Sequence, residues 1–204
     1  MSVLSRWLLL GCCLLGGVAR AEGPVTVELI LFRYTDALDA TRWPPATGSL
    51  DFSSATPLPG APASGEAGFF TALPKSALRL AAVSTALRRA GPYEVLLHTA
   101  WRQPSRAGGP LYLESAPGAE RASPALTGSL QLREAGAEIR LSGDFLVQVG
   151  DQQVRVSPNQ NFRVQELRYI DHALLGLLVQ VTPDSGTAEA RAAPPAAASP
   201  GPAD

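Results

Sequence analysis

The chain has 204 residues, of which 46% are hydrophobic and 17% are charged, and its formal net charge is −1. This length allows one domain with a sizeable core. The balanced charge argues against nucleic acid as the main partner, because nucleic-acid-binding domains carry a basic excess.

The first 21 residues have the three-part pattern of a secretory signal peptide. Arg6 supplies a positive charge, residues 7–18 form an apolar run, and Ala19-Arg20-Ala21 is a small-x-small cleavage site. The run is too short to span a hydrocarbon core of ~30 Å as a helix. We predict cleavage after Ala21, with an uncleaved anchor or a lipoprotein modified at Cys12 as alternatives.

Cleavage would remove Cys12 and Cys13, the only cysteines. The remaining chain would then hold no disulfide, thiolate metal site or cysteine nucleophile. Residues 22–204 carry 15 basic and 18 acidic side chains, a net charge of −3. They contain no second apolar run long enough to cross a bilayer. We therefore predict a periplasmic protein whose mature chain does not insert into the membrane.

The first half of the mature sequence alternates between regular and irregular stretches. Apolar and polar side chains alternate over residues 25–33, which predicts a strand. Residues 35–73 are rich in Pro, Gly, Ser and Ala and are predicted to form one long loop. A helix is predicted after Pro74, with Ser76 as its N-cap and an end at Gly91. Its apolar face consists of Leu80, Val83 and Leu87.

The second half is predicted to be mainly extended. Residues 93–101 are apolar at most positions, so we expect a central strand that completes a βαβ-like unit with the first strand and the helix. Residues 139–149 keep a period of two, typical of a strand with one buried face. The other predicted strands cover residues 111–113, 130–133, 154–156, 162–170 and 174–181.

These elements predict a single α+β domain over residues 22–182. It would consist of the βαβ-like unit and an antiparallel meander in one sheet, with one main helix, and a ferredoxin-like arrangement is the specific expectation. Residues 183–204 are rich in Pro and Ala, cannot bury a core, and are predicted to be a disordered tail.

Common catalytic motifs are missing from the sequence. It contains no G-x-S-x-G, H-E-x-x-H, S-x-x-K or Gly-rich phosphate loop. The two histidines, His98 and His172, would have to converge with a carboxylate such as Asp171 to form a metal or hydrolytic site. We predict no enzymatic activity, no catalytic residue, no cofactor and no metal.

Residues 98–103, at the end of the second predicted strand, form the first candidate binding segment. An aromatic ring there could pack on a sugar, while an arginine or glutamine bonds its polar groups. The alternative interpretation is that Trp101 belongs to the core and Arg102 stacks over it. The candidate binding residues of this segment are His98, Trp101, Arg102 and Gln103.

Residues 166–179 form the second candidate segment, with a polar, aromatic half followed by an apolar half. As structure, Asp171 and His172 would fix a turn between two strands. As function, Arg168, Tyr169 and His172 would line a polar surface. Gly176 marks a bulge or a close backbone approach. The candidate binding residues of this segment are Arg168, Tyr169 and His172.

Four stretches, taken together and in this order, resemble the CsiV family, periplasmic proteins of gammaproteobacteria linked to cell-shape integrity. They are the opening strand V-T-V-E-L-I-L-F-R at residues 25–33, the W-P at Trp43-Pro44, L-H-T-A-W-R-Q at residues 97–103, and E-L-R-Y-I-D-H-A-L-L-G at residues 166–176. The chain departs from the family pattern at Ala173, where a proline is usual. The arginine-rich run before the last stretch is reduced to Arg163, and the Pro/Ala-rich tail is extra.

The resemblance implies a non-enzymatic accessory protein of cell-wall synthesis that binds peptidoglycan. It also implies help in activating a bifunctional penicillin-binding protein through its outer-membrane lipoprotein activator. The family supplies no catalytic residues to carry over. One alternative is a pure protein–protein adaptor of the envelope without glycan binding, and a weaker one is a cell-wall hydrolase.

Overall fold

The structure, a computed structural model, describes residues 23–58, 69–104, 106, 108–116 and 124–184. The predicted signal peptide, both cysteines and nearly all of the predicted tail lie outside the described residues. No helix within the described ranges is long and apolar enough to cross a membrane.

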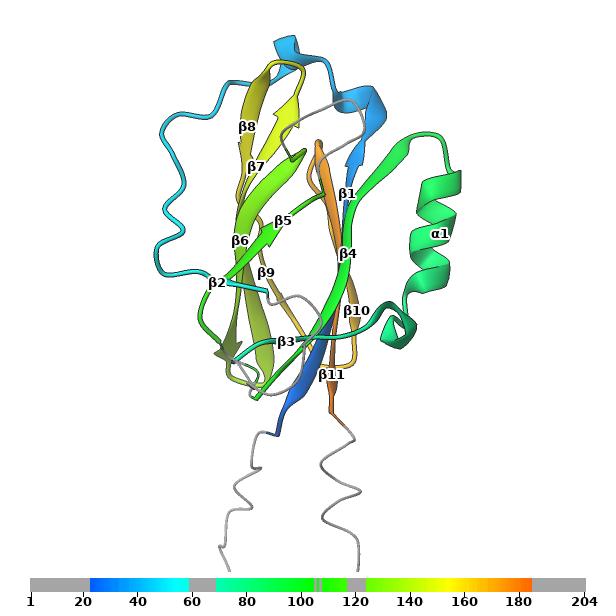
Figure 1. The fold of residues 1–204 in the computed structure, drawn as a ribbon, viewed down its shortest axis with the longest axis vertical. Helices are drawn as coiled ribbons and strands as arrows, with labels where there is room; N and C mark the ends of the chain where they lie inside the picture. Colours follow the sequence, from blue (N-terminus) through cyan, green and yellow to red (C-terminus); the bar gives the residue numbers. More distant parts are fainter. Residues whose placement is uncertain (1–22, 59–68, 105, 107, 117–123, 185–204) are drawn as a thin grey trace, which may run out of the picture.

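The fold is mostly β and consists of two sheets that pack face to face, with one helix outside them (Figure 1). Sheet A has the order β10 (Leu167–Ile170), β11 (Leu175–Pro183), β1 (Val25–Tyr34), β4 (Tyr93–Gln103), β3 (Thr71–Ala72). The main path of sheet B has the order β2 (Thr56–Pro57), β5 (Leu111–Glu114), β6 (Leu126–Ala135), β7 (Glu138–Val149), β8 (Gln152–Val156). A further strand, β9 (Asn159–Phe162), also pairs with β7.

The period-two pattern of the long strands builds the core between the sheets. Alternate residues of β1 (Val25, Val27, Leu29, Leu31) face those of β7 and its neighbours across one apolar cluster. This follows from strand geometry, since successive side chains point to opposite faces of a sheet. The strand predicted over residues 139–149 is confirmed as β7, with Ile139, Leu141, Phe145, Val147 and Val149 fully buried.

Helix α1 (Ala81–Arg89) covers part of the outer face of sheet A. Ile30, Phe32 and Val95 of the sheet form a second apolar cluster, against which the predicted helical face packs. That face consists of Leu80, Val83 and Leu87. Strand β1 is therefore buried on both sides, which explains why residues 29–32 form an unbroken apolar run.

The helix begins later than predicted, at Ala81, and Ser76 is not its N-cap. Ser76 lies in the short 3-10 helix η3 (Lys75–Ala77), and Leu78 after it is extended. The N–H groups of Arg79 and Leu80 are instead bound by the carboxylate of Glu28, at 2.9 and 2.8 Å. The side chain of Glu28, on the distant strand β1, thus binds N–H groups at the start of the helix in place of the expected local N-cap.

The predicted βαβ-like unit in a single sheet, with a ferredoxin-like arrangement, is wrong. Strands β1 and β4 are antiparallel, with Leu29 opposite Thr99, and the meander belongs to a second sheet. The cause is the segment after β1, whose described parts contain η1 (Thr35–Ala37), η2 (Ala40–Arg42), β2 and β3. It carries the chain back along the molecule before α1 begins, so β4 runs opposite to β1 (Figure 1).

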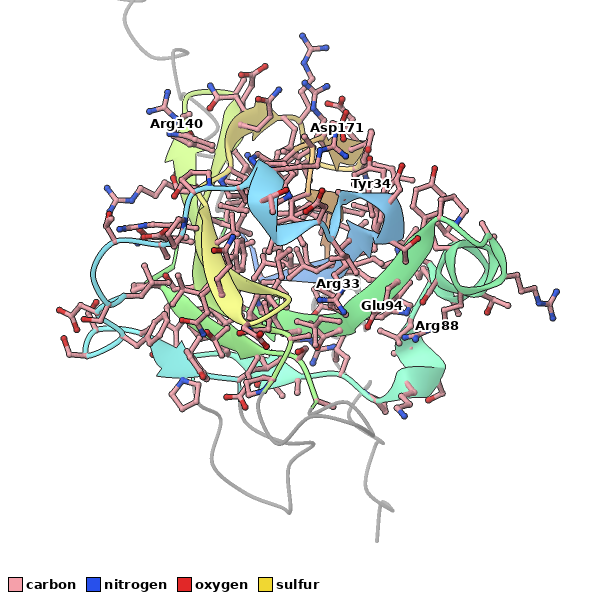
Figure 2. The ribbon with its side chains drawn as sticks, turned by 90° about the horizontal axis from the view of Figure 1, so that it is seen from above. Arg33, Tyr34, Arg88, Glu94, Arg140 and Asp171 are labelled. Carbon is pink, nitrogen blue, oxygen red and sulfur yellow. The ribbon has the colours of Figure 1, made fainter. Side chains whose placement is uncertain are left out.

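The two ends of the sandwich differ. The described chain enters and leaves at one end, where the Asp184 amide bonds the Pro24 carbonyl at 2.9 Å. At the other end Arg33, although buried, donates to Glu94 (2.8 Å) and to the carbonyl of Gln148 on β7 (2.8 Å). This arginine ties the two sheets together beneath the η1 and η2 turns (Figure 2).

Candidate functional site

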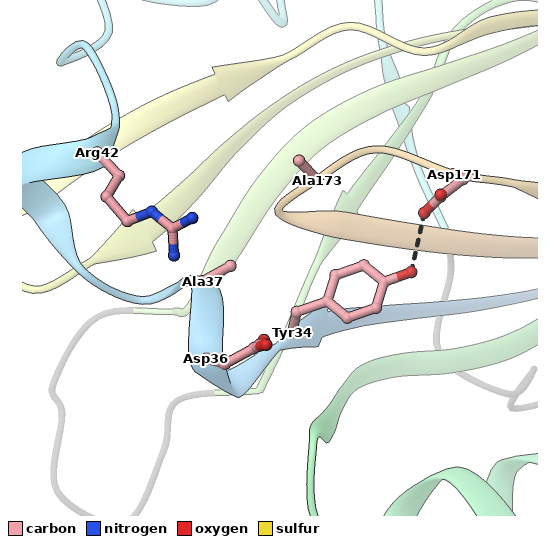
Figure 3. A pocket seen from close by; sticks show the side chains of 6 residues that line it. All are labelled: Tyr34, Asp36, Ala37, Arg42, Asp171 and Ala173. Atoms are coloured by element: carbon pink, nitrogen blue, oxygen red, sulfur yellow. Dashed lines mark hydrogen bonds between the residues drawn. The ribbon is translucent and has the colours of Figure 1, made fainter.

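An open pocket of about 320 Å³ lies at the end of sheet A opposite the ends of the described chain, Gly23 and Asp184. Strand β1 and the two turns after it supply one wall, and the β10–β11 turn supplies the other (Figure 3). The pocket is lined by Tyr34, Asp36, Ala37, Arg42, Asp171 and Ala173.

The β10–β11 turn is fixed by its own backbone and by His172. The His172 and Leu175 backbones exchange hydrogen bonds at 3.1 and 3.2 Å, which closes a two-residue hairpin. The His172 Nδ1 accepts the Leu174 N–H at 3.1 Å. Burial lowers the pKa of His172, and the neutral ring that results is the form able to accept this bond. The interpretation that this residue fixes a turn is thus supported by its contacts.

Asp171 anchors a cluster of tyrosine hydroxyls at the rim. Tyr34 and Tyr169 both donate to Asp171 Oδ1, at 2.8 and 2.7 Å, and their hydroxyls also contact each other. The bond from Tyr169, followed by that from Tyr34, holds the pKa of Asp171 below its usual value. Burial is the main cause that raises the pKa of Tyr34 and of Tyr169. At neutral pH the cluster is therefore a carboxylate held by two intact hydroxyls.

The tyrosine cluster rests on an aromatic base. The ring of Tyr169 stacks on Phe32 with centroids 6.3 Å apart and an interplanar angle of 9°. Tyr34 meets Phe32 edge-on at 5.9 Å. The Tyr169 side chain is nevertheless 45% exposed. One face of its ring is held by the protein, so the ring is available to a ligand without further ordering.

The first predicted segment does not lie at this pocket. Trp101 is only 1% exposed and belongs to the core, where its Nε1 donates to the buried Gln103 at 2.9 Å. His98 lies on the outer face of sheet A, where its side chain is only 9% exposed and bonds Glu28 at 2.8 Å. These three residues offer no surface to a ligand. The core interpretation of Trp101 is the correct one.

Arg102 is exposed, but it lies at the far end of the sandwich. It pairs with Asp184, the last described residue, and stands opposite Thr26 on β1. Eight residues of extended strand separate Thr26 from Tyr34, about 26 Å at ~3.3 Å per residue. The two predicted segments therefore do not form one surface.

The second predicted segment contributes two of its three candidates to the pocket end, Tyr169 and His172. Arg168 lies on β10, pairs with Glu166 at 3.3 Å, and its Nε has no hydrogen-bond partner among the described atoms. The ring of His172 lies 5.9 Å from that of Trp43, whose Nε1 donates to the Ala37 carbonyl at 2.7 Å. The W-P motif thus fastens η1 close to the β10–β11 turn.

Sequence reasoning missed Tyr34, Asp36 and Arg42, because residues 35–73 were predicted to be one loop. The signal available was a tyrosine at the end of a buried strand, followed by an acidic residue in a short connection. Within the described ranges, no group of three or more His, Cys, Asp or Glu side chains could hold a metal ion.

Comparisons of the chain with protein-family models, with curated proteins and with solved structures gave no match. The CsiV resemblance therefore stays an expectation drawn from the sequence, and the site is interpreted from its own geometry.

Proposed function

We propose that this chain is a non-enzymatic periplasmic accessory protein of cell-wall synthesis that binds peptidoglycan at the pocket end of sheet A. The observation that carries the proposal is the exposed ring of Tyr169 beside the Asp171 carboxylate and the pocket. An exposed ring backed by other aromatic rings packs well on the C–H face of a sugar or an alkyl chain. Carboxylate and guanidinium groups next to it can bond amides, hydroxyls and charged ends.

The sequence supports the same proposal independently. The stretch that resembles the E-L-x-Y-x-D-H motif includes Tyr169, Asp171 and His172, and the W-P motif packs against it. Under the proposal, the protein also helps to activate a bifunctional penicillin-binding protein through its outer-membrane lipoprotein activator.

The second candidate function is a protein–protein adaptor that does not touch glycan. It is favoured by β10, an edge strand of sheet A whose Leu167 and Tyr169 are 43% and 45% exposed. Exposed apolar side chains on a strand edge suit the addition of a partner strand.

Sedimentation of the chain from Glu22 to Asp204 with purified sacculi separates these functions. The proposal predicts co-sedimentation without release of soluble fragments. It also predicts weaker co-sedimentation of Tyr169→Ala. The matched control is Tyr112→Ala, since Tyr112 likewise donates to a carboxylate two residues later, Glu114, at 2.6 Å, but on sheet B.

Each contrary outcome points elsewhere. A protein that stays in the supernatant, yet is retained by the lipoprotein activator, would favour the adaptor. Released fragments would favour a hydrolase. Equal loss of co-sedimentation by Tyr169→Ala and Tyr112→Ala would show that Tyr169 is not part of the binding surface.

A further inference from the structure

Charges of both signs face the pocket without making hydrogen bonds or ion pairs to other described residues. Asp36 comes from η1 and Arg42 from η2, and both are exposed. Among the described residues, neither side chain makes a hydrogen bond or an ion pair. Figure 3 shows Asp36 and Arg42 on the two sides of Ala37, with Asp171 across the pocket from them. Asp39 lies close enough to Arg42 for their charges to interact. Neither Asp36 nor Arg42 is held by a bonded partner in the described part of the chain, so both can bond a ligand.

The third charge is the carboxylate of Asp171, of which only one oxygen accepts hydrogen bonds from described residues. Both tyrosine hydroxyls donate to Oδ1 of Asp171, and no donor within the described part of the chain reaches its Oδ2. The tyrosines thus hold the carboxylate in one orientation and leave one oxygen available. Such pre-organisation favours binding, because little side-chain entropy remains to be lost.

The combination of these three charges favours one class of ligand over others. One guanidinium and two carboxylates give the pocket an excess of one negative charge. A neutral sugar would leave all three unpaired, and a purely anionic group would face two carboxylates, which is unfavourable. A group with an ammonium and a carboxylate a few atoms apart would pair with both signs.

We propose that the pocket binds the zwitterionic amino-acid end of a peptide, with its carboxylate on Arg42 and its ammonium attracted by the carboxylates of Asp36 and Asp171. This inference rests on the proposed function and deepens it. In peptidoglycan, free amino and carboxyl groups belong to the stem peptides, while the glycan strands supply the sugar rings. The pocket therefore binds the stem peptide, and the exposed ring face of Tyr169 remains available to the rest of the polymer.

Three forms of one polymer test the inference, the two insoluble ones by co-sedimentation and the soluble one by competition with intact sacculi. They are intact sacculi, sacculi whose free amines have been acetylated, and glycan strands stripped of their stem peptides by an amidase. Acetylation removes the ammonium but keeps the carboxylates and the sugars. We expect it to weaken binding about tenfold or more, the usual effect of losing a charge-assisted hydrogen bond. The stripped strands, which are soluble, should not displace the chain from intact sacculi.

Two variants assign the effect to the pocket. Arg42→Gln and Asp36→Asn should each weaken binding to intact sacculi by a similar factor. Both side chains are exposed and make no hydrogen bond or ion pair with the described residues, so unfolding is not expected. The control is Arg88→Gln, since Arg88 is also an exposed arginine but lies in the last turn of α1, away from the pocket (Figure 2).

The outcomes separate the inference from the proposed function. Equal binding to all three polymers, or unchanged binding by both pocket variants, would overturn the zwitterion site and leave peptidoglycan binding intact. No binding to intact sacculi would overturn both. Preference for intact sacculi that is lost in the pocket variants and kept in Arg88→Gln would support both.

Discussion

The ring of Phe32 occupies the space that a side chain at Gly176 would need. The two residues are cross-strand partners on β1 and β11, and a Cβ built on Gly176 would lie 2.2 Å from Phe32 Cζ. Phe32 in turn stacks on Tyr169. The absence of a side chain at Gly176 therefore allows Phe32 to take the position in which it supports the tyrosine cluster.

Gly176→Ala is expected to lower the free energy of unfolding by about 1–3 kcal/mol, because the ring must move to admit a methyl group. The move should also displace Tyr169 and weaken sacculus binding. Urea denaturation measures the first effect and co-sedimentation the second. Gly91→Ala is the control, since nothing lies within 4 Å of a Cβ there and its φ is not positive. Equal stability of the two variants would show that Phe32 relaxes freely.

Trp101→Ala is expected to destabilise the domain by about 3–5 kcal/mol, since it empties a large volume in the core. It also removes the donor that bonds Gln103. Arg102→Ala, one position later, should change stability by only about 0–1 kcal/mol, because its ion pair with Asp184 is half exposed. Thermal unfolding compares the two. A fully folded Trp101→Ala variant with reduced binding would contradict the core assignment.

Glu28→Gln should loosen α1. The buried carboxylate accepts the N–H groups of Arg79 and Leu80 and bonds His98. In the variant, the NH2 group of the amide would face at least one of these N–H groups, and that hydrogen bond would be lost. We expect a loss of about 1–3 kcal/mol, the usual cost of an unsatisfied buried group. Hydrogen exchange should rise across residues 79–89 before it rises in β7. Uniform exchange across the domain would argue that the helix is held by its apolar face alone.

His172 makes stability depend on pH in a definite direction. Its pKa lies below the ordinary 6.5, so near and below that pH the unfolded chain binds more protons than the folded one. Its contribution is complete above about pH 6.5 and is lost as the pH falls through the folded pKa. Asp171 titrates in a lower range, because its pKa lies below 3.8.

His172→Asn isolates this effect. An asparagine side-chain oxygen can accept the Leu174 N–H as Nδ1 does, but it does not titrate in this range. We expect stability to fall between about pH 7.5 and about pH 5.5 in the parent chain and to fall less in the variant. Parallel pH profiles for the two chains would mean that the ring is protonated without cost.

Local periodicity predicted the strands well and their pairing poorly. The alternation in residues 25–33 and 139–149 fixes which side chains face a core, and both became long buried strands. Nothing in that alternation tells whether β1 and β4 run parallel. Their direction depends on the path of residues 35–80, which is set by tertiary contacts and not by local pattern.

Only part of the candidate site was predicted from the sequence, because tertiary contacts and not local pattern bring its other residues together. Tyr169 and His172 stand in a segment with an unusual polar-to-apolar change, and they lie at the pocket end. Trp101 and His98 carry equally suggestive chemistry but are buried, because strand position decides which face a residue takes. Asp36 and Arg42 could not be found, since only the folded turns bring them opposite Asp171.

The central claim is that the pocket end of sheet A binds peptidoglycan. An NMR titration of the isotope-labelled chain from Glu22 to Asp204 with soluble muropeptides tests it most directly, by reporting each backbone amide. The account predicts concentration-dependent shifts confined to residues 34–43 and 168–175, with Arg102 and Asp184 at the far end unchanged. Shifts centred on Arg102 and Asp184, or no shifts at any muropeptide concentration, would contradict it.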